Sequence, residues 1–266
     1  MNDPRNPYAP PATHVADHDE SQGLSDSERF IPFGRTVAAG RGAAWIGDAW
    51  RILRGQPGMW AAAMILLFCA YVVLSIVPVV SFFSQFLTPF VVAGIALAAE
   101  QQRRTGAFDL KALVGGFEKH TPELLAVGLT AFLAGILFLV VLAVFLGADI
   151  LTMVKNGAQS DPSQVMTLKF LLAFLVGLAL MMPVAFATYL APQLIVLHDQ
   201  PALTALKMSL IGLARNILPG IVFGLCTMGL VLVSMIPLFL GLLITLPILV
   251  ITNYTIYRDI FIEENA

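Results

Sequence analysis

Residues 191–220, APQLIVLHDQPALTALKMSLIGLARNILPG, join two apolar segments through a short stretch of mixed character. The first apolar segment ends at His198 and Asp199, and the next one opens at Pro219 and Gly220. Four leucines between them recur at the spacing of one helical face, namely Leu203, Leu206, Leu210 and Leu213. The joint therefore predicts an amphipathic helix between two apolar helices, and similar joints recur along the chain.

The composition of the 266 residues is far more apolar than that of a soluble domain. Hydrophobic residues make up 58% of the chain and charged residues 12%, against about 45–50% and about 25% in typical soluble domains. Cys69 and Cys226 both lie inside apolar runs, which favours small buried hydrophobes over a disulfide or a thiolate metal site. We predict an all-α, polytopic membrane protein.

The N-terminal residues 1–38 differ from the rest of the chain. They are rich in proline and acidic residues, so burial of apolar surface cannot offset the entropy lost on ordering. They also lack the basic and apolar regions of a cleaved signal peptide. We predict a disordered tail over residues 1–38 and a transmembrane domain over residues 39–262, whose first membrane helix is its own targeting signal.

Six apolar runs are long enough, with their flanks, to cross a hydrocarbon core of about 30 Å. They cover residues 59–77, 84–102, 123–146, 167–197, 217–236 and 242–257. The fourth run is longer than a bilayer requires, so we expect it to tilt or to kink at Pro183 or Pro192. Residues 149–164 are expected to form the only sizeable loop between spans. The runs predict six transmembrane helices in three hairpins.

An amphipathic segment precedes each hairpin. Residues 41–54 place Trp45 and Trp50 at the apolar edge with arginines opposite, which is typical of a helix in the headgroup layer. Residues 109–119 and the joint quoted above show the same periodicity. We therefore predict three units, residues 41–104, 108–198 and 200–260, each with a cytoplasmic interfacial helix before its hairpin.

The first and third units share a proline pattern. Residues 75–78, SIVP, are followed by Pro89 much as residues 234–237, SMIP, are followed by Pro247. This match predicts an internal repeat. Both units enter the membrane from the same side, so we expect a parallel repeat with its rotation axis along the membrane normal and the corner prolines superposed.

Lysine and arginine residues are concentrated on one side of the predicted spans. Ten lie near span ends on the side of the chain termini, whereas two, Lys155 and Lys169, lie on the other side. Positive residues favour the cytoplasmic side of a membrane. We therefore expect both termini and all three amphipathic segments to be cytoplasmic.

The opening joint also carries a resemblance to known proteins. Ala191-Pro192, Leu197-His198-Asp199, Ala205-Leu206, Ser209 and Arg215-Asn216 look like a pattern found in a group of bacterial six-helix inner-membrane proteins. That pattern is similar to the membrane domain attached to some glycerophosphoryl diester phosphodiesterases. Residues 45–57 also resemble an uncharacterised proteobacterial transmembrane family. The resemblance covers about residues 41–263 and implies six spans and a bacterial inner (cytoplasmic) membrane, but no activity; the soluble phosphodiesterase domain is not seen here.

Three residues near the cytoplasmic span ends are candidates for chemistry. His198 and Asp199 could form a metal or acid–base pair, or could simply end a helix before Pro201. Glu100 could line a cytoplasmic vestibule or could be a solvated boundary charge. The span interiors hold no Asp, Glu, Lys, Arg or His, and phosphate-loop, HExxH and GxSxG motifs are missing, which disfavours ion-coupled transport and common hydrolase mechanisms. We assign no catalytic, cofactor-binding or metal-binding residue.

Uncharged polar residues inside the spans are the remaining candidates, above all Gln85, Gln193 and Asn253. Three functions stay open. A non-catalytic membrane scaffold or assembly factor is favoured, because the amphipathic segments offer a docking surface. A permease for a lipid-like or neutral solute requires these three residues to converge on one cavity, and a membrane enzyme requires Glu100 to meet the His198–Asp199 pair. Expected partners are membrane lipids, with other membrane proteins or a second copy as alternatives, and no nucleic acid.

Overall fold

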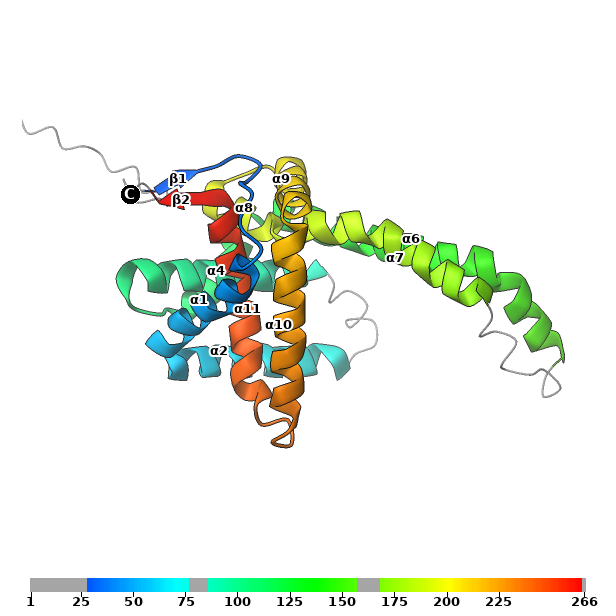
Figure 1. Ribbon diagram of the computed structural model, residues 1–266, viewed down its shortest axis with the longest axis horizontal. Coiled ribbons are helices and arrows are strands. Elements are labelled where there is room, and N and C mark those ends of the chain that lie inside the picture. The colour runs from blue at the N-terminus through cyan, green and yellow to red at the C-terminus, as the bar shows by residue number, and fades with distance from the viewer. Residues whose placement is uncertain (1–27, 77–85, 157–167, 265–266) are drawn as a thin grey trace, which may run out of the picture.

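The computed structural model describes residues 28–76, 86–156 and 168–264, which are almost entirely helical (Figure 1). Its elements in chain order are β1 (Glu28–Phe30), α1 (Arg41–Gly55), α2 (Pro57–Ile76), α4 (Thr88–Thr105), the 3₁₀ helix η2 (Leu110–Val114), α5 (Gly116–Lys119), α6 (Thr121–Asn156), α7 (Leu168–Tyr189), α8 (Ala191–His198), α9 (Ala202–Arg215), α10 (Ile217–Met235), α11 (Leu242–Phe261) and β2 (Ile262–Glu264). The fold consists of a packed base and of long apolar helices that leave it.

The base has a hydrophobic core where α1, α4, α8 and α11 meet. Trp45 of α1, Phe90 of α4, Leu194 of α8 and Ile251 of α11 are at most 2% exposed. Helix α4 lies at the centre, and its small residues let neighbours approach closely. A Cβ atom added at Gly94 would lie 2.0 Å from the carbonyl oxygen of Leu113 in η2. Glycine is therefore required where η2 crosses α4.

Four helices of the described residues are long and apolar enough to cross a membrane: residues 57–76, 121–148, 168–198 and 217–235. Their large apolar side chains point outward, since Phe68 of α2, Val144 of α6 and Leu232 of α10 are 66%, 76% and 58% exposed. An apolar surface of this extent is unfavourable in water. The structure thus agrees with the prediction of a helical membrane protein.

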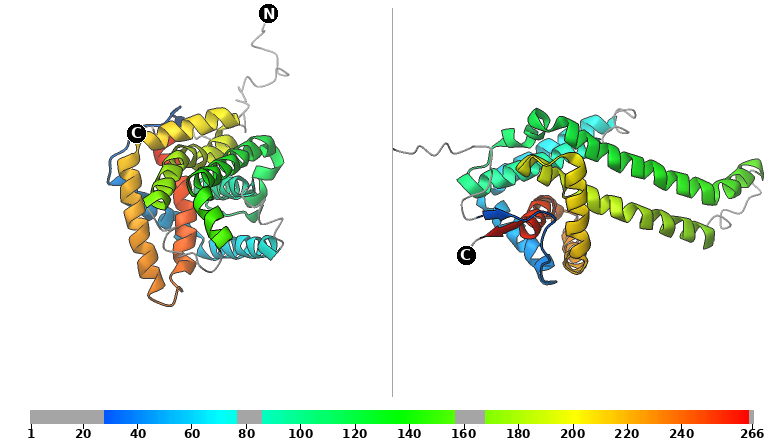
Figure 2. Two further views of the ribbon diagram at one scale, coloured as in Figure 1. Left: turned by 90° about the vertical axis from the view of Figure 1, so that its right-hand side faces the viewer. Right: turned by 90° about the horizontal axis from the view of Figure 1, so that it is seen from above.

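The long helices leave the base in different directions. Helices α6 and α7 pack along each other and extend to the right in Figure 1, with Gly177 of α7 against the ring of Phe138. Helices α10 and α11 extend downward and are joined by a 2.6 Å hydrogen bond between the hydroxyls of Ser234 and Thr245. Both views in Figure 2 show that these two pairs diverge.

The fourth apolar run is broken between α7 and α8, as the sequence predicted for Pro192. Proline has no amide hydrogen, so the helical ladder cannot continue through it. Ser209 of α9 satisfies the groups that the break exposes: its Oγ accepts from the Leu190 amide at 3.0 Å and donates to the Phe186 carbonyl at 2.5 Å. Pro183, by contrast, lies inside α7.

Two other segments differ from the sequence prediction. Helix α6 continues to Asn156, so residues 149–156 are helical rather than part of a loop, and residues 157–167 lie outside the described residues. Residues 109–119 form η2 and the short α5 instead of one amphipathic helix, because Gly115 and Gly116 weaken a continuous helix there.

The chain is also structured earlier than predicted. Strand β1 pairs with β2 in antiparallel register, with Glu28 opposite Glu264 and Phe30 opposite Ile262. Further along, the Val37 amide donates to Asn216 Oδ1 at 2.8 Å. Residues 28–38 thus have partners in β2 and at Asn216, which differs from the predicted disordered tail over residues 1–38; residues 1–27 lie outside the described residues.

Helix α1 does not present its whole apolar face to a membrane. Trp45 is 1% exposed, packs edge-on to Phe223 of α10 and donates from Nε1 to Asp259 Oδ2 at 2.6 Å. Trp50 is 44% exposed. Protein therefore covers the apolar face of α1 at Trp45, and the headgroup depth expected for the two indoles stays a prediction.

The predicted second and sixth spans form α4 and α11, which are not among the four described helices that are long and apolar enough to cross a membrane. Their C-terminal halves carry the charged and aromatic residues of the base, which lowers their apolar content. The superposition predicted for Pro78 on Pro237 falls on residues 77–85, outside the described residues, and so does Gln85.

Candidate functional site

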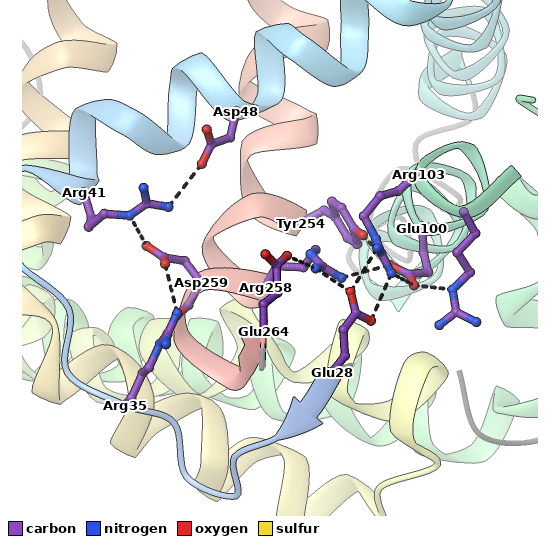
Figure 3. Close-up of polar contacts among 11 residues, drawn as sticks. Glu28, Arg35, Arg41, Asp48, Glu100, Arg103, Tyr254, Arg258, Asp259 and Glu264 are labelled. Carbon is purple, nitrogen blue, oxygen red and sulfur yellow. Dashed lines mark hydrogen bonds and ion pairs between the residues drawn. The ribbon is translucent and has the colours of Figure 1, made fainter. Parts of the chain in front are cut away.

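A buried ion-pair cluster surrounds Glu100 of α4 (Figure 3). Glu100 is 8% exposed and accepts from Arg103 Nη2 at 2.7 Å, one helical turn away, and from Arg104 Nε. The hydroxyl of Tyr254, from α11, donates to the other carboxylate oxygen. Glu100 therefore joins α4 to α11 through charge-assisted hydrogen bonds.

Glu28 brings the N-terminal segment into the same cluster. Its carboxylate lies 2.9 Å from Arg103 Nη1 and 2.8 Å from Arg258 Nη2, and its side chain is 3% exposed. Arg258 also pairs with Glu264 of β2 at 2.9 Å. The pairing of β1 with β2 positions Glu28. Arg103 and Arg258 therefore join β1 to α4 and α11.

Asp259 organises a second set of contacts on the opposite face of α11 (Figure 3). It accepts from Arg41 Nε at 2.8 Å and from the Trp45 indole at 2.6 Å, and it lies 3.5 Å from Arg35 Nη2. Arg41 also contacts Asp48 at 3.2 Å. This aspartate therefore fastens α1 and the segment before it to α11.

The electrostatics of Glu100 reflect competing effects. Burial alone raises the pKa of a carboxyl group, but hydrogen bonds from Arg103 and Tyr254 and the charge of Arg103 outweigh it and lower the pKa to about 2. The carboxylate is thus ionised at neutral pH and its oxygens are occupied by donors. This arrangement suits structural pairing better than general-base catalysis, which needs a carboxylate poised near the working pH.

A cavity of about 670 Å³ lies beside the cluster. Arg51, Arg103 and Arg258 line it together with Asp48 and Glu264. These arginines are each paired with a carboxylate. The cavity therefore offers mixed charge, with no concentrated positive field that would select an anion.

The three residues proposed for an enzyme bond to different partners in the structure. His198 Nε2 hydrogen-bonds the hydroxyl of Tyr257, and its ring stacks on Phe30 at a centroid distance of 4.0 Å. Asp199 ends α8 in the left-handed conformation and lies 3.2 Å from His120 Nε2, while 68% of its side chain is exposed. Glu100 bonds within its own cluster. The helix-ending interpretation of His198 and Asp199 fits this geometry.

The structure does bring two permease candidates together. Gln193 Nε2 of α8 donates to Asn253 Oδ1 of α11, and both residues line a second cavity of about 280 Å³. Gln193 is fully buried, and its Oε1 has no hydrogen-bond partner within the described part of the chain. The third candidate, Gln85, is not among the described residues.

Sequence reasoning missed Glu28, Tyr254 and Asp259. The run Tyr254 to Asp259 follows an apolar stretch and mixes aromatic with charged residues, which is a usable signal for a buried polar cluster at a span end. Glu28 carried no such signal, because it lies in a proline-rich, acidic segment. In the described ranges, His, Cys, Asp and Glu side chains form no group of three or more suited to a metal ion.

Comparisons of the chain with protein-family models, with curated proteins and with solved structures find no match. The class of the protein therefore rests on the fold itself. Four long apolar helices with outward-facing side chains indicate a membrane protein.

Proposed function

We propose that the chain is a multi-pass protein of the bacterial inner membrane with six spans in three hairpins, α2–α4, α6–α7 and α10–α11. The second and sixth spans would include the apolar first parts of α4, residues 88–99, and of α11, residues 242–253, which at about 18 Å each cover part of the hydrocarbon core. Their charged ends, from Glu100 and Tyr254 onward, belong to the base. The resemblance of residues 41–263 to six-helix inner-membrane proteins supports the same topology.

The charge distribution supports a cytoplasmic base with both termini inside. The arginines of α1, α4 and α11 lie in the base, whereas Lys155 and Lys169 lie at the far end of the α6–α7 pair (Figure 1). Positive residues are retained on the cytoplasmic side.

A cyclic pattern of contacts supports three parallel units. The amphipathic segment η2 of the second unit packs on α4 of the first, and α9 of the third packs on α7 of the second. Helix α1 of the first unit packs on α10 and α11 of the third, which closes the ring. Each amphipathic segment thus packs on the hairpin of the preceding unit, as is expected of a parallel repeat about a common axis.

Within this topology, we propose a non-catalytic scaffold or assembly factor. The observation that carries this proposal is the commitment of Glu100, Glu28 and Asp259 to internal ion pairs that fasten the base. Arg54 of α1 is exposed, and Arg51, although paired with Asp48, keeps 67% of its side chain exposed, so this part of α1 offers positive charge to another membrane protein or to anionic headgroups.

Crosslinking followed by affinity purification in mild detergent tests this function. A scaffold should retain a stoichiometric membrane-protein partner, and the charge reversals Arg51→Glu and Arg54→Glu should release it. Lys155→Glu, a reversal at the far end of α6, is the matched control and should retain it. Purification of the wild-type chain without any partner would argue against a scaffold.

A permease for a lipid-like or neutral solute is the second candidate, favoured by the meeting of Gln193 and Asn253 at one cavity. Solute flux into proteoliposomes that contain the purified chain would support it. Loss of that flux in Gln193→Leu, with a normal melting temperature, would tie transport to the cavity.

An enzyme is disfavoured, because Glu100, His198 and Asp199 bond to different partners.

A further inference from the structure

We propose that the cavity of about 280 Å³ between α4, α8 and α11 binds a neutral lipid with a free hydroxyl group, whose alkyl chain lies along the apolar walls. The cavity is close to the lower end of small-molecule sites, which is about 300 Å³. It therefore suits one chain segment with a small polar end.

The walls select against charge. Val92, Ile95 and the small Ala96 of α4 line the cavity together with Leu249 and Val250 of α11. A charged group placed among these side chains would lose its hydration without gaining a counter-ion. The occupant is therefore uncharged where it contacts the walls.

The polar lining at Gln193 selects for a hydrogen-bond donor. Gln193 Nε2 is used by Asn253, whereas the buried Gln193 Oε1 accepts no bond from the described residues. A buried acceptor without a donor is unfavourable, because it has lost its hydrogen bonds to water. A hydroxyl group supplies that donor, an alkane leaves the acceptor unpaired, and a carboxylate adds a second acceptor beside it.

The position of the cavity indicates entry from the bilayer. Leu246, which lines it, is 51% exposed on the apolar part of α11, beside the exposed Leu243 and Ile244. This is the part of α11 that we place in the membrane. The inference rests on that placement but needs no transport, because binding requires the cavity alone.

Photolabelling of the full chain in phosphatidylcholine nanodiscs tests the inference. The probe is a twelve-carbon alcohol with a mid-chain diazirine, and the matched probe ends in a methyl group instead of the hydroxyl. Labelling is read on the cavity peptides, residues 91–96 and 246–250, relative to residues 171–178 of α7 in the same molecule. Residues 171–178 report contact with lipid, so their labelling tests membrane placement separately.

We expect the alcohol to label the cavity peptides about fivefold more than the alkane, the ratio that one hydrogen bond of about 1 kcal/mol supports. Both probes should label α7 equally. Gln193→Leu should abolish the preference, and Ala96→Phe should abolish cavity labelling by filling the space. Gln101→Leu, a glutamine of α4 outside the cavity, is the control and should keep the wild-type ratio.

Equal cavity labelling by the two probes in the wild type would mean that water satisfies Gln193, and it would overturn the proposal. Persistent labelling in Ala96→Phe would overturn it as well. If that variant does not fold, as judged by its melting temperature, Ala96→Leu carries the same test with a smaller insertion. Absent labelling of residues 171–178 would instead refute membrane placement.

Discussion

At the scale of single residues, the base depends on buried charges whose partners come from distant parts of the chain. Glu100 bonds to Tyr254, 154 positions away, and Glu28 reaches Arg103 and Arg258 across 75 and 230 positions. Removing one member of a buried pair leaves the others uncompensated, which is far more costly than losing an exposed pair.

Glu100→Gln should therefore destabilise the protein by about 3 kcal/mol at neutral pH. The substitution keeps the shape of the side chain but leaves Arg103 and Arg104 with less negative charge around them. Thermal unfolding in detergent measures the effect. Glu118→Gln, at an exposed position of α5, is the control and should change stability by less than about 0.5 kcal/mol. Equal effects of the two substitutions would contradict a structural role for the cluster.

The same variant should reveal the low pKa of Glu100. Its pKa in the folded protein is about 2, below the ordinary value of 4.5. Its ionisation therefore stabilises the fold fully above pH 4.5, and this contribution is lost as the pH falls towards 2. The difference in melting temperature between wild type and Glu100→Gln should be constant above pH 5 and should shrink below pH 4.5. A difference that is independent of pH down to 3 would exclude this shift.

At Gly94, the lack of space for a side chain determines which residue the fold accepts. Gly94→Ala should cost about 1–3 kcal/mol, because the new Cβ meets the Leu113 backbone and η2 must move away from α4. Gly224→Ala in α10 is the matched control, since a Cβ there meets no atom within 4 Å. Circular dichroism melts of both variants test the prediction, which fails if Gly94→Ala is as stable as Gly224→Ala.

At the scale of elements, the break between α7 and α8 shows how a local rule and a tertiary contact combine. Pro192 interrupts the backbone ladder, but the freed groups are stable in an apolar setting only when another donor or acceptor reaches them. Ser209 supplies both bonds from α9. Residues 191–220 therefore contain both Pro192, which interrupts the helix, and Ser209, which bonds to the backbone groups at the interruption.

Ser209→Ala should destabilise the protein by about 1–3 kcal/mol, because the buried Leu190 amide loses its acceptor. Ser75→Ala removes a hydroxyl that bonds to the exposed end of α2 and should be nearly neutral. Amide hydrogen exchange gives a local readout: exchange at Leu190 should accelerate in Ser209→Ala. Unchanged protection at Leu190 would show that the serine is dispensable.

At the scale of the whole molecule, the charge bias predicts orientation. Alkaline phosphatase fused after Asn265 should be inactive, and a fusion within residues 157–160 should be active, because the enzyme folds only outside the cytoplasm. A green fluorescent protein fused after Asn265 is the complementary control and should fluoresce. Phosphatase activity from the C-terminal fusion would invert the proposed topology.

The divergence of the helix pairs leads to a second prediction at this scale. Transmembrane helices tilt by about 0–40° from the bilayer normal, so pairs that diverge as in Figures 1 and 2 must align further to cross one membrane. The α6–α7 pair can turn at two points, the break at Leu190 before α8 and the junction at His120 between α5 and α6. We expect the far ends of α6 and α10 to lie closer together in nanodiscs than in the structure.

Spin labels at Val154→Cys and Leu238→Cys measure that distance by double electron–electron resonance, after Cys69 and Cys226 are replaced by serine. Labels within the base, at Arg54→Cys and Leu203→Cys, provide the control and should keep the separation seen in the structure. If the first pair also keeps its separation, the hinge does not act and the six-span arrangement needs revision.

Several features of the protein could be predicted from the sequence, because they depend on nearest neighbours. Long apolar runs specify α6, α7 and α10, since helices are the local solution to backbone hydrogen bonding in an apolar medium. The missing amide of Pro192 specifies the break before α8. Gln193 and Asn253 could be named as candidates because polar residues are rare within such runs.

Tertiary structure alone decided which charges meet and which faces are covered. Glu28 looked disordered until β2 and two arginines provided partners, and Trp45 looked like a lipid-facing residue until α10 and Asp259 covered it. The periodicity of a helix shows that it has an apolar face, but it does not say whether lipid or protein will cover that face. That choice depends on how segments separated by up to 230 positions come together.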